Sequence, residues 1–467
     1  MGGKRTASWT RQAPALALLA VFLTPTAARA GNTDEVNAGI DVTLSGGAVV
    51  ASTYTGAALW YNPAGIARIK KASLEITGIT FQTQIVRVPG FVTIGTDPPT
   101  ESEGKTVNFT VIPEAITFTI VLKENLKLGI GLFNSSIRRS LLTEEVTTAP
   151  DISPEVTAVG GRSSRNKFHH VSGGLAGTLG KKQNVWLGGT LDIVVGNSRI
   201  DSTRVFTFDQ GESGFVTEGE ISVETSFGLQ LKAGLQWAPI KEIRVGFSVA
   251  TPTYAFILIN RFATTFGQSP PVGMPLPPGD GNAQAADGTQ YRGVRGGWWG
   301  VEPGNARLGI AYVGAWGWIE GDLVAQWRLR TPELGIDLKT IVNGRVGSAF
   351  RLTRFMKLGV GVFTDRSPID RIRVTRVATT DIDFYGVHLG FLFSNREVHP
   401  DRPDVGRKQK REKVGLTIAI GLRYAFGRGD VLGRFVPPQY DPSAAGTFPT
   451  SGKIHELSLN LGAKVLF

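Results

Sequence analysis

The sequence predicts an all-β protein, a transmembrane antiparallel β-barrel of about 14 strands, and three observations lead there. Long stretches alternate between apolar and polar residues with a period of two. After the first thirty residues, no stretch reaches the roughly 20 apolar residues that a membrane-spanning helix needs. The chain also ends on an amphipathic stretch whose last residue is aromatic, Phe467. Glycine, at 59 of 467 residues, suits turns and packed strands better than helices.

Residues 1–30 are typical of a secretory signal peptide. They combine a basic start, an apolar core and a small-residue ending, at Lys4, Arg5 and Arg11, at 13–23 and at 28–30. The sequence therefore predicts export beyond the inner membrane. Removing these residues takes away four positive charges and no negative ones, so the net charge falls from +11 to +7. That charge is too diffuse to indicate a nucleic-acid partner.

The alternation is clearest in three stretches, 221–237, 319–330 and 414–426. In the first, every second residue from Ile221 to Trp237 is apolar or Thr, while the opposite parity holds Ser, Glu, Gln, Lys and Gly. Each stretch exceeds the roughly 9 to 11 residues that a tilted strand needs to cross a bilayer. A soluble sandwich would also alternate, but its strands cluster near five or six residues. The lengths therefore favour the membrane.

Fourteen such segments follow one another, an even number, as a closed antiparallel barrel requires. They are 72–86, 107–122, 127–138, 166–180, 184–206, 220–238, 241–263, 305–315, 317–331, 340–352, 355–365, 380–395, 412–427 and 453–467. The predicted periplasmic turns are short, at 123–126, 181–184, 239–241, 315–317 and 353–355. The predicted outer loops are long, above all 267–304, which we expect to be irregular. The connection 395–412 is long where a short turn is expected, which leaves the count open by one hairpin.

Aromatic residues beside the short turns predict a girdle at the inner interface, made of Trp186, Trp237, Trp316 and Trp318. The last segment places Leu457, Leu459, Leu461 and Phe467 on one face. It resembles the closing strand of bacterial outer-membrane barrels, which commonly ends on an aromatic residue read by the assembly machinery. The expected partners are therefore this machinery, through the strand ending at Phe467, together with outer-membrane lipid and lipopolysaccharide.

Enzymatic and metal sites find little support in the sequence. The chain has no Cys, which excludes disulfides and thiolate sites, and only five His. His388 has no evident partner, and His169 and His170 must point to opposite faces of their strand. The stretch 280–288 lacks the Gly and Glu of a calcium loop. We therefore expect no enzyme, no cofactor, no metal site and no nucleic-acid partner.

The phrase Leu59–Lys71, "LWYNPAGIARIKK", predicts a short helix ahead of the first strand. Asn62 suits the N-cap, and Pro63 suits the first helical position, where its missing N–H costs nothing. From chemistry alone, this could be no more than a capped helix that leads into the barrel.

The run 31–69, with Asn62-Pro63-Ala64-Gly65 between aromatic Tyr61 and Ile66, resembles the start of the FadL/TodX family of outer-membrane transporters. In that family, which takes up long-chain fatty acids and aromatic hydrocarbons, a small segment with an Asn-Pro-Ala motif plugs a fourteen-stranded barrel. The resemblance implies a plug at residues 31–71, a barrel at 72–467 and a gating role for Asn62, Pro63, Ala64 and Gly65. One departure lies upstream, where 55–58 lack the acidic residue that family members often carry.

The resemblance implies passive uptake of a hydrophobic small-molecule ligand. The ligand would be captured among the outer loops, held in the lumen and released when the plug shifts, with a sideways exit as one route. A carboxylate headgroup would need an inward cation, and parity offers Lys232, Arg328, Arg330 and Arg423, although charged residues line such lumens in any case. Two alternatives stay open, an adapter barrel that binds secreted or surface proteins and a general diffusion porin. Fatty acid, alkane and arene are not distinguished.

Overall fold

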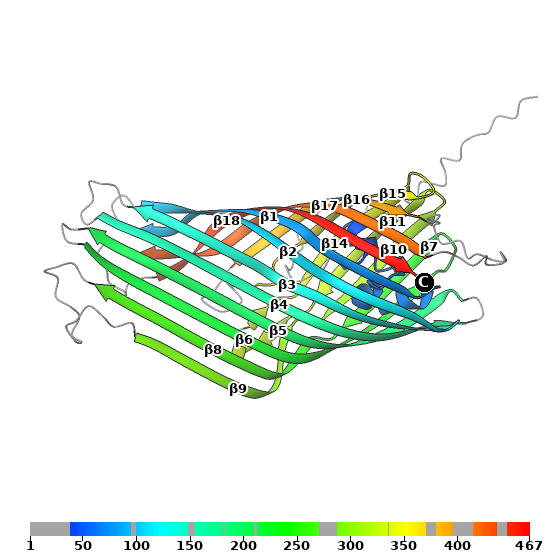
Figure 1. Cartoon of the computed structure of the whole chain (residues 1–467), viewed down its shortest axis with the longest axis horizontal. Helices are drawn as coiled ribbons and strands as arrows, with labels where there is room; N and C mark the ends of the chain where they lie inside the picture. The colour runs from blue at the N-terminus through cyan, green and yellow to red at the C-terminus, as the bar shows by residue number, and fades with distance from the viewer. Residues whose placement is uncertain are drawn as a thin grey trace, which may run out of the picture.

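The computed structural model describes residues 38–94, 100–147, 155–180, 183–209, 213–269, 287–334, 336–369, 380–395, 414–436 and 446–467. The described strands form one sheet in the order β5-β4-β3-β2-β1-β18-β17-β16-β15-β14-β11-β10-β7-β6-β8-β9. Pairing between β5 and β6 closes this sheet into a barrel of long tilted strands (Figure 1). The predicted signal peptide lies outside the described residues.

The first half of the wall is built from β1 (Ser73–Ile94), β2 (Thr100–Lys123), β3 (Leu126–Thr147), β4 (Glu155–Leu179), β5 (Val185–Asp209), β6 (Ser213–Trp237), β7 (Ile243–Ala250) and β8 (Thr253–Ser269). The second half is built from β9 (Asp287–Glu302), β10 (Asn305–Gly314), β11 (Gly317–Gln326), β14 (Ile341–Arg351), β15 (Met356–Asp365), β16 (Thr380–Ser394), β17 (Gly415–Val436) and β18 (Gly446–Leu466). β7 and β8 both pair with β6, and only two residues separate the end of β7 from the start of β8, so the two form one interrupted wall strand. Two residues likewise separate β9 from β10, which form another interrupted strand. The wall therefore has 14 strands, as predicted.

The predicted short turns are confirmed wherever the structure describes them. β2 and β3, β10 and β11, and β14 and β15 are each joined by two to four residues at one end of the barrel, which we call the short-turn end. β16 pairs directly with β17 from Ser394↔Thr417 upward, so the doubtful connection 395–412 joins two neighbouring strands and the count holds. Most of that connection lies outside the described residues. The C-terminus lies at the short-turn end (Figure 1).

Outward positions carry the apolar belt that a bilayer requires. Large apolar side chains are exposed there, including Val171, Leu175, Leu187, Leu191, Leu389, Leu422, Leu457 and Leu461. The predicted girdle is half right, because Trp237 and Trp316 are exposed whereas Trp186 and Trp318 pack inward. Trp186 and Trp318 share the parity of the buried residues Asp192 and Asp322, which sets them on the inner face. No helix among the described residues is long and apolar enough to cross a membrane.

Two predictions fail on the side of the barrel between β9 and β15. The stretch 267–304 was expected to be irregular, yet β9 occupies Asp287–Glu302 and pairs with β8. Residues 270–286 lie outside the described residues. The predicted strand 317–331 leaves the wall after Gln326. It continues as an inward hairpin made of β12 (Leu329–Thr331), the 3-10 turn η3 (Pro332–Leu334) and β13 (Ile336–Leu338).

Residues 38–71 lie inside the barrel near the short-turn end, coloured blue in Figure 1. We call them the N-terminal segment. It contains α2 (Ile40–Ser45), α3 (Ala58–Tyr61) and the 3-10 helix η2 (Pro63–Arg68). Small and apolar residues dominate it, so it packs tightly against the wall, and its core residues Val42, Val49, Leu59, Tyr61 and Ile66 are almost fully buried.

Candidate functional site

The Asn62-Pro63-Ala64-Gly65 motif sits at the contact between the N-terminal segment and the wall. The Asn62 side chain caps η2, since its Oδ1 accepts a hydrogen bond from the Ala64 amide at 3.2 Å. The cap expected from the sequence is therefore present, although the helix is 3-10 and ends at Arg68. Asn62 Nδ2 donates to Val50 O at 2.8 Å and to Leu235 O of β6 at 3.0 Å. One side chain thus joins the helix start, the rest of the segment and the barrel.

Two wall glycines make room for this motif. A Cβ on Gly234 of β6 would lie 2.1 Å from Asn62 Oδ1. A Cβ on Gly188 of β5 would lie 2.5 Å from Pro63 C and O. Both separations are shorter than real Cβ contacts, so any other residue at these sites would displace the motif. The wall sequence is therefore fitted to the N-terminal segment.

Buried carboxylates on the wall accept hydrogen bonds from the backbone of the N-terminal segment. Glu75 of β1 receives the amides of Ile40 at 2.6 Å and Gly56 at 3.1 Å. Asp322 of β11 receives those of Val49 at 2.7 Å and Val50 at 3.0 Å, and Glu320 receives that of Ala51 at 2.6 Å. These acceptors satisfy backbone amides whose burial without a partner would cost about 1–3 kcal/mol each. The three carboxylates thereby hold the backbone of the N-terminal segment at Ile40, at Val49–Ala51 and at Gly56.

Wall donors satisfy the carbonyl groups of the same segment. Arg307 Nη1 donates to Trp60 O at 3.0 Å, and Ser248 Oγ donates to Tyr61 O at 2.8 Å. His388 Nε2 lies 2.7 Å from Thr43 O, so its lumenal position is confirmed and it serves as a contact to the segment. Sequence parity places these residues and the three acids on the inner face. Parity gives no sign of what these residues contact, because their partners are backbone atoms at least 19 residues away in the sequence.

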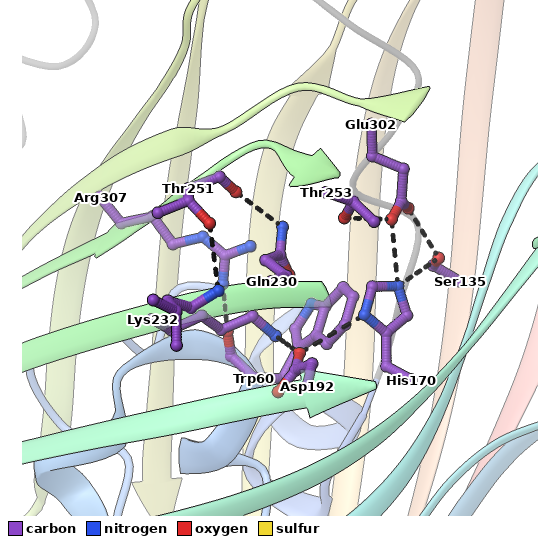
Figure 2. A network of polar contacts seen from close by, with 11 residues as sticks. Trp60, Ser135, His170, Asp192, Gln230, Lys232, Thr251, Thr253, Glu302 and Arg307 are labelled. Atoms are coloured by element: carbon purple, nitrogen blue, oxygen red, sulfur yellow. Dashed lines mark hydrogen bonds and ion pairs between the residues drawn. The ribbon is translucent and has the colours of Figure 1, made fainter. Parts of the chain in front are cut away.

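A polar network lies on the side of Trp60 that faces the lumen (Figure 2). The Lys232 ammonium is 2.6 Å from Asp192 Oδ2 and 3.9 Å from the Trp60 ring centroid. His170 lies edge-on to Trp60, with 4.9 Å between ring centroids. Its Nδ1 is 3.4 Å from Asp192 Oδ2 and its Nε2 is 3.4 Å from Glu302 Oε2. Opposite charges therefore compensate one another within the network, as burial requires.

A pocket of about 40 Å3 opens between this network and β10. It is lined by Trp60, His170, Gln230, Lys232, Ala250, Glu302, Pro303, Asn305, Arg307 and Gln326. Such a volume holds a water molecule or two but no hydrocarbon. This pocket is therefore too small for a hydrocarbon unless side chains or the N-terminal segment move.

The four cations predicted to face the lumen lie in three different surroundings. Lys232 lines the pocket, already paired with Asp192. Arg423 is buried against Glu456, at 3.2 Å, and lies over the Phe363 ring. Arg328 and Arg330 belong to the inward hairpin, where Arg328 pairs with Asp337 at 3.1 Å and both arginines are exposed. The sequence pattern placed Arg328 and Arg330 on a wall strand, but that strand ends where the chain bends at Trp327.

Ser135, His170 and Asp192 lie in the order of a hydrolytic triad, but their surroundings work against that chemistry. Ser135 Oγ is 3.4 Å from His170 Nε2, the nitrogen that would act as the base. Glu302 lies equally close to that nitrogen, and Ser135 Oγ donates to Glu302 Oε1 at 3.3 Å. Nε2 is therefore occupied by a carboxylate, and Asp192 is shared with Lys232. The group is a compensated ionic network rather than an activated nucleophile.

The wall has a separation close to Trp60. β2 and β3 pair from the short turn as far as Ala115↔Phe133 and no farther among the described residues. Beyond this point β2 continues along β1, while β3 continues along β4 with a register shift between Ile137 and Ser140. Phe133, the last paired residue, lies 5.5 Å from Trp60 between ring centroids. The N-terminal segment thus reaches the place where two wall strands part.

No family model and no curated protein sequence matches the chain. Solved structures match almost all of it. A FadL homologue from Pseudomonas aeruginosa has a TM-score of 0.58 at 14% identity, covering 95% of this chain and 99% of that one. The toluene transporter TodX of Pseudomonas putida has a TM-score of 0.53 at 13% identity, covering 93% and 97%. The toluene transporter TbuX of Ralstonia pickettii has 0.50 at 12%, covering 93% and 99%.

At such low sequence identity, the similarity to these structures establishes the fold alone. The coverage shows that the shared fold extends over the whole barrel. The closed barrel, its apolar belt and its inward N-terminal segment agree with the resemblance read from the motif. The chain has the fold of the FadL/TodX-type barrels of the bacterial outer membrane.

Proposed function

We propose that the protein takes up hydrophobic compounds across the bacterial outer membrane by passive diffusion, with the N-terminal segment as a movable plug. The observation that carries this proposal is the way in which the segment is held. It is joined to the wall by separate hydrogen bonds to residues of several strands, including β1, β6 and β11, and not by a continuous sheet. Such contacts can be exchanged for water or ligand one by one, so the segment can shift while the barrel stays intact.

Asn62, Pro63, Ala64 and Gly65 are the residues that we propose transmit this shift. They form the start of η2 and contact β5 and β6 through Gly188 and Gly234. A movement of this motif would carry Trp60 with it, since only Tyr61 separates Trp60 from Asn62. The separation of β2 from β3 beside Phe133 then offers the sideways exit to the membrane.

The ligand is expected to be hydrophobic and of low charge. Lys232, the only one of the four predicted cations in the pocket, has its charge compensated by Asp192 at 2.6 Å. An incoming carboxylate would have to replace Asp192 and would face Glu302 across the same pocket. Uncharged hydrocarbons meet no such penalty and gain about 25 cal/mol per Å2 of surface removed from water. This reasoning favours arenes, alkanes and neutral amphiphiles over fatty acids.

The test is accumulation of labelled compounds in cells that lack their own uptake proteins for them. Expression of the protein should increase accumulation of toluene and decane several-fold over an empty vector, and should leave arabinose unchanged. Equal gains for arabinose would indicate a general porin. No gain for any compound, with a secreted protein captured at the cell surface, would indicate the adapter alternative and refute uptake.

A further inference from the structure

The hairpin β12–η3–β13, which we call the inner hairpin, leaves the wall and turns into the lumen. Gln326 is the last residue in the register of β10 and β11, and the amide of the next residue, Trp327, still donates to Gly304 O at 3.2 Å. The next amide, of Arg328, donates across the hairpin to Thr340 Oγ1 at 3.1 Å. As a result, β9 has no strand partner on its second edge among the described residues. If β11 continued straight along the wall, it would pair with this free edge of β9.

The inner hairpin is amphipathic, which explains why it folds inward. Its buried side chains are Leu329, Thr331, Leu334, Ile336 and Leu338. The four apolar ones, Leu329, Leu334, Ile336 and Leu338, form one cluster with Phe168 of β4, Val194 of β5, Ala255 and Leu258 of β8, Val301 of β9 and Ile369. Its other face carries Arg330 and the exposed pair Arg328–Asp337. The hairpin therefore presents its apolar face to the inner wall and its charged face away from it.

The apolar cluster reaches across the lumen. β4 and β5 lie nearly opposite the segment that follows β15 in the order of the barrel, yet Phe168, Val194 and Ile369 belong to one cluster. Hydrogen bonds hold the hairpin from both sides. Thr331 Oγ1 donates to Gly300 O of β9 at 2.8 Å, and the Lys339 amide donates to Pro368 O at 2.7 Å. Leu338 and Ile369 form an isolated β-bridge.

The cluster lies beyond the polar network, on the side away from the N-terminal segment. Phe168 and Val194 are each two residues from the network residues His170 and Asp192, on the same inward faces and farther from the short-turn end. The lumen is therefore layered, with the N-terminal segment first, the charged network second and the apolar cluster third. At the same far end, the tip of β1 bends past β18, and Val92–Ile94 pair with β17.

We propose that the inner hairpin is a second closure of the lumen, independent of the N-terminal segment, and that it selects for apolar ligands. When the hairpin swings away from the wall, its apolar face and the facing wall residues lose their contacts. A hydrocarbon can take the place of the hairpin on Phe168, Val194 and Leu258, and so offset that loss, whereas a polar solute cannot. The inference rests on the proposed uptake for its selective role, but the closure itself can be tested without any ligand.

Steady conductance in planar bilayers tests the closure. Four proteins are compared: the mature chain, a variant lacking residues 31–67, a variant in which 329–338 is replaced by a Gly-Ser-Gly turn, and the double variant. We expect each single variant to stay within about twofold of the mature chain and the double variant to conduct at least tenfold more. Full conductance from the deletion of 31–67 alone would overturn the proposal.

A full-length variant keeps the test decisive if a deleted chain fails to fold. The protein contains no Cys, so Leu338→Cys with Ile369→Cys introduces one disulfide that fixes the inner hairpin at its β-bridge. Toluene accumulation should fall at least tenfold on oxidation and recover on reduction. The control pair Val346→Cys with Val362→Cys joins two wall strands that are already paired and should change nothing. Unchanged uptake in the oxidised hairpin variant would overturn the gating role.

The two arms separate the failure of this inference from the failure of uptake itself. If the reduced protein accumulates no toluene, the proposed function fails, and the conductance series still decides whether the hairpin closes the lumen.

A milder variant adds a graded readout. A Cβ at Gly300 would lie 2.4 Å from Leu329 Cδ1, whereas one at Gly296 of the same strand meets nothing within 4 Å. In the background lacking 31–67, Gly300→Val should raise conductance and Gly296→Val should not.

Discussion

The ammonium group of Lys232 lies 3.9 Å from the centroid of the Trp60 ring, so β6 holds the lumenal side of the N-terminal segment directly. The contact is buried, and the same ammonium is paired with Asp192 at 2.6 Å. A cation over an indole ring is worth about 0.5–2 kcal/mol, with the larger value in a desolvated site. This relationship connects the position of the segment to the charge balance of the network above it.

Lys232→Met is expected to loosen the N-terminal segment at Trp60. Loss of about 1–2 kcal/mol of cation–π attraction raises the open fraction of the segment by a factor of about 10. Hydrogen–deuterium exchange of a peptide covering 57–62 should be faster by that factor. The double variant Lys232→Met with Asp192→Asn removes the carboxylate that the single change leaves without its cation, and it should recover part of the protection. Unchanged exchange in the single variant would show that the contact does not hold the segment.

Gly234→Ala is expected to displace the Asn62 motif. The new methyl group would lie 2.1 Å from Asn62 Oδ1, so either the cap or the strand must shift. Overpacking of this kind costs about 1–3 kcal/mol. Proteolysis within residues 62–71 by added trypsin should become measurable on the purified protein. Gly173→Ala of β4 is the matched control, because a Cβ there meets nothing within 4 Å, and it should stay as resistant as the unchanged chain.

Asp322→Ala is expected to release the loop at Val49 and Val50. Both amides lose their acceptor, and an unpaired buried donor costs about 1–3 kcal/mol. Amide exchange at 48–51 should accelerate by at least tenfold, while exchange in the wall strands stays unchanged. Asp337→Ala removes a partly exposed carboxylate on the inner hairpin and should leave exchange at 48–51 as it was. Similar exchange in both variants would argue that Asp322 does not anchor the segment.

Closing the separation between β2 and β3 is expected to reduce uptake if ligand leaves sideways. Glu114 and Ser135 are the buried, inward side chains next to the last pair, Ala115↔Phe133, so Glu114→Cys with Ser135→Cys bridges the start of the separation. Oxidation should lower toluene accumulation several-fold, with recovery on reduction. Full uptake by the oxidised protein would indicate release through the short-turn end instead.

The barrel could be predicted from the sequence because one physical rule applies along each strand. Residues from Ile221 to Trp237 must alternate when one face meets lipid and the other meets the lumen, and β6 follows that pattern. The rule fails where the surroundings change. The bend at Trp327 turns β12 inward, so Arg328 and Arg330 lie on the inner hairpin and not on a wall strand as parity predicted. β9 was missed because its Gly- and Arg-rich sequence lacks the alternation of a lipid-facing strand.

The contacts of the site were less predictable than the fold. The cap at Asn62 follows from local chemistry, since Asn before Pro favours a helix start. The roles of Glu75, Glu320 and Asp322 depend on contacts between distant parts of the chain, and alternation reports only that a residue faces inward. The network of His170, Asp192, Lys232 and Glu302 joins four strands, and the pairing register between neighbouring strands, which alternation does not report, decides which of their inward side chains meet.

Reversible fixing of the N-terminal segment to the wall tests the central claim most directly. A Cβ on Gly347 of β14 would lie 3.1 Å from Ala48 Cβ, close to the roughly 3.5–4.5 Å of a disulfide, and 2.6 Å from Ser45 O, so Ala48→Cys with Gly347→Cys can join the segment to the barrel once the backbone at Ser45 shifts. The measurement is toluene accumulation by cells expressing this variant, with and without reductant. If the segment must move for uptake, accumulation falls to the empty-vector level when the pair is oxidised and returns on reduction. Undiminished accumulation with the disulfide fully formed would contradict a movable plug.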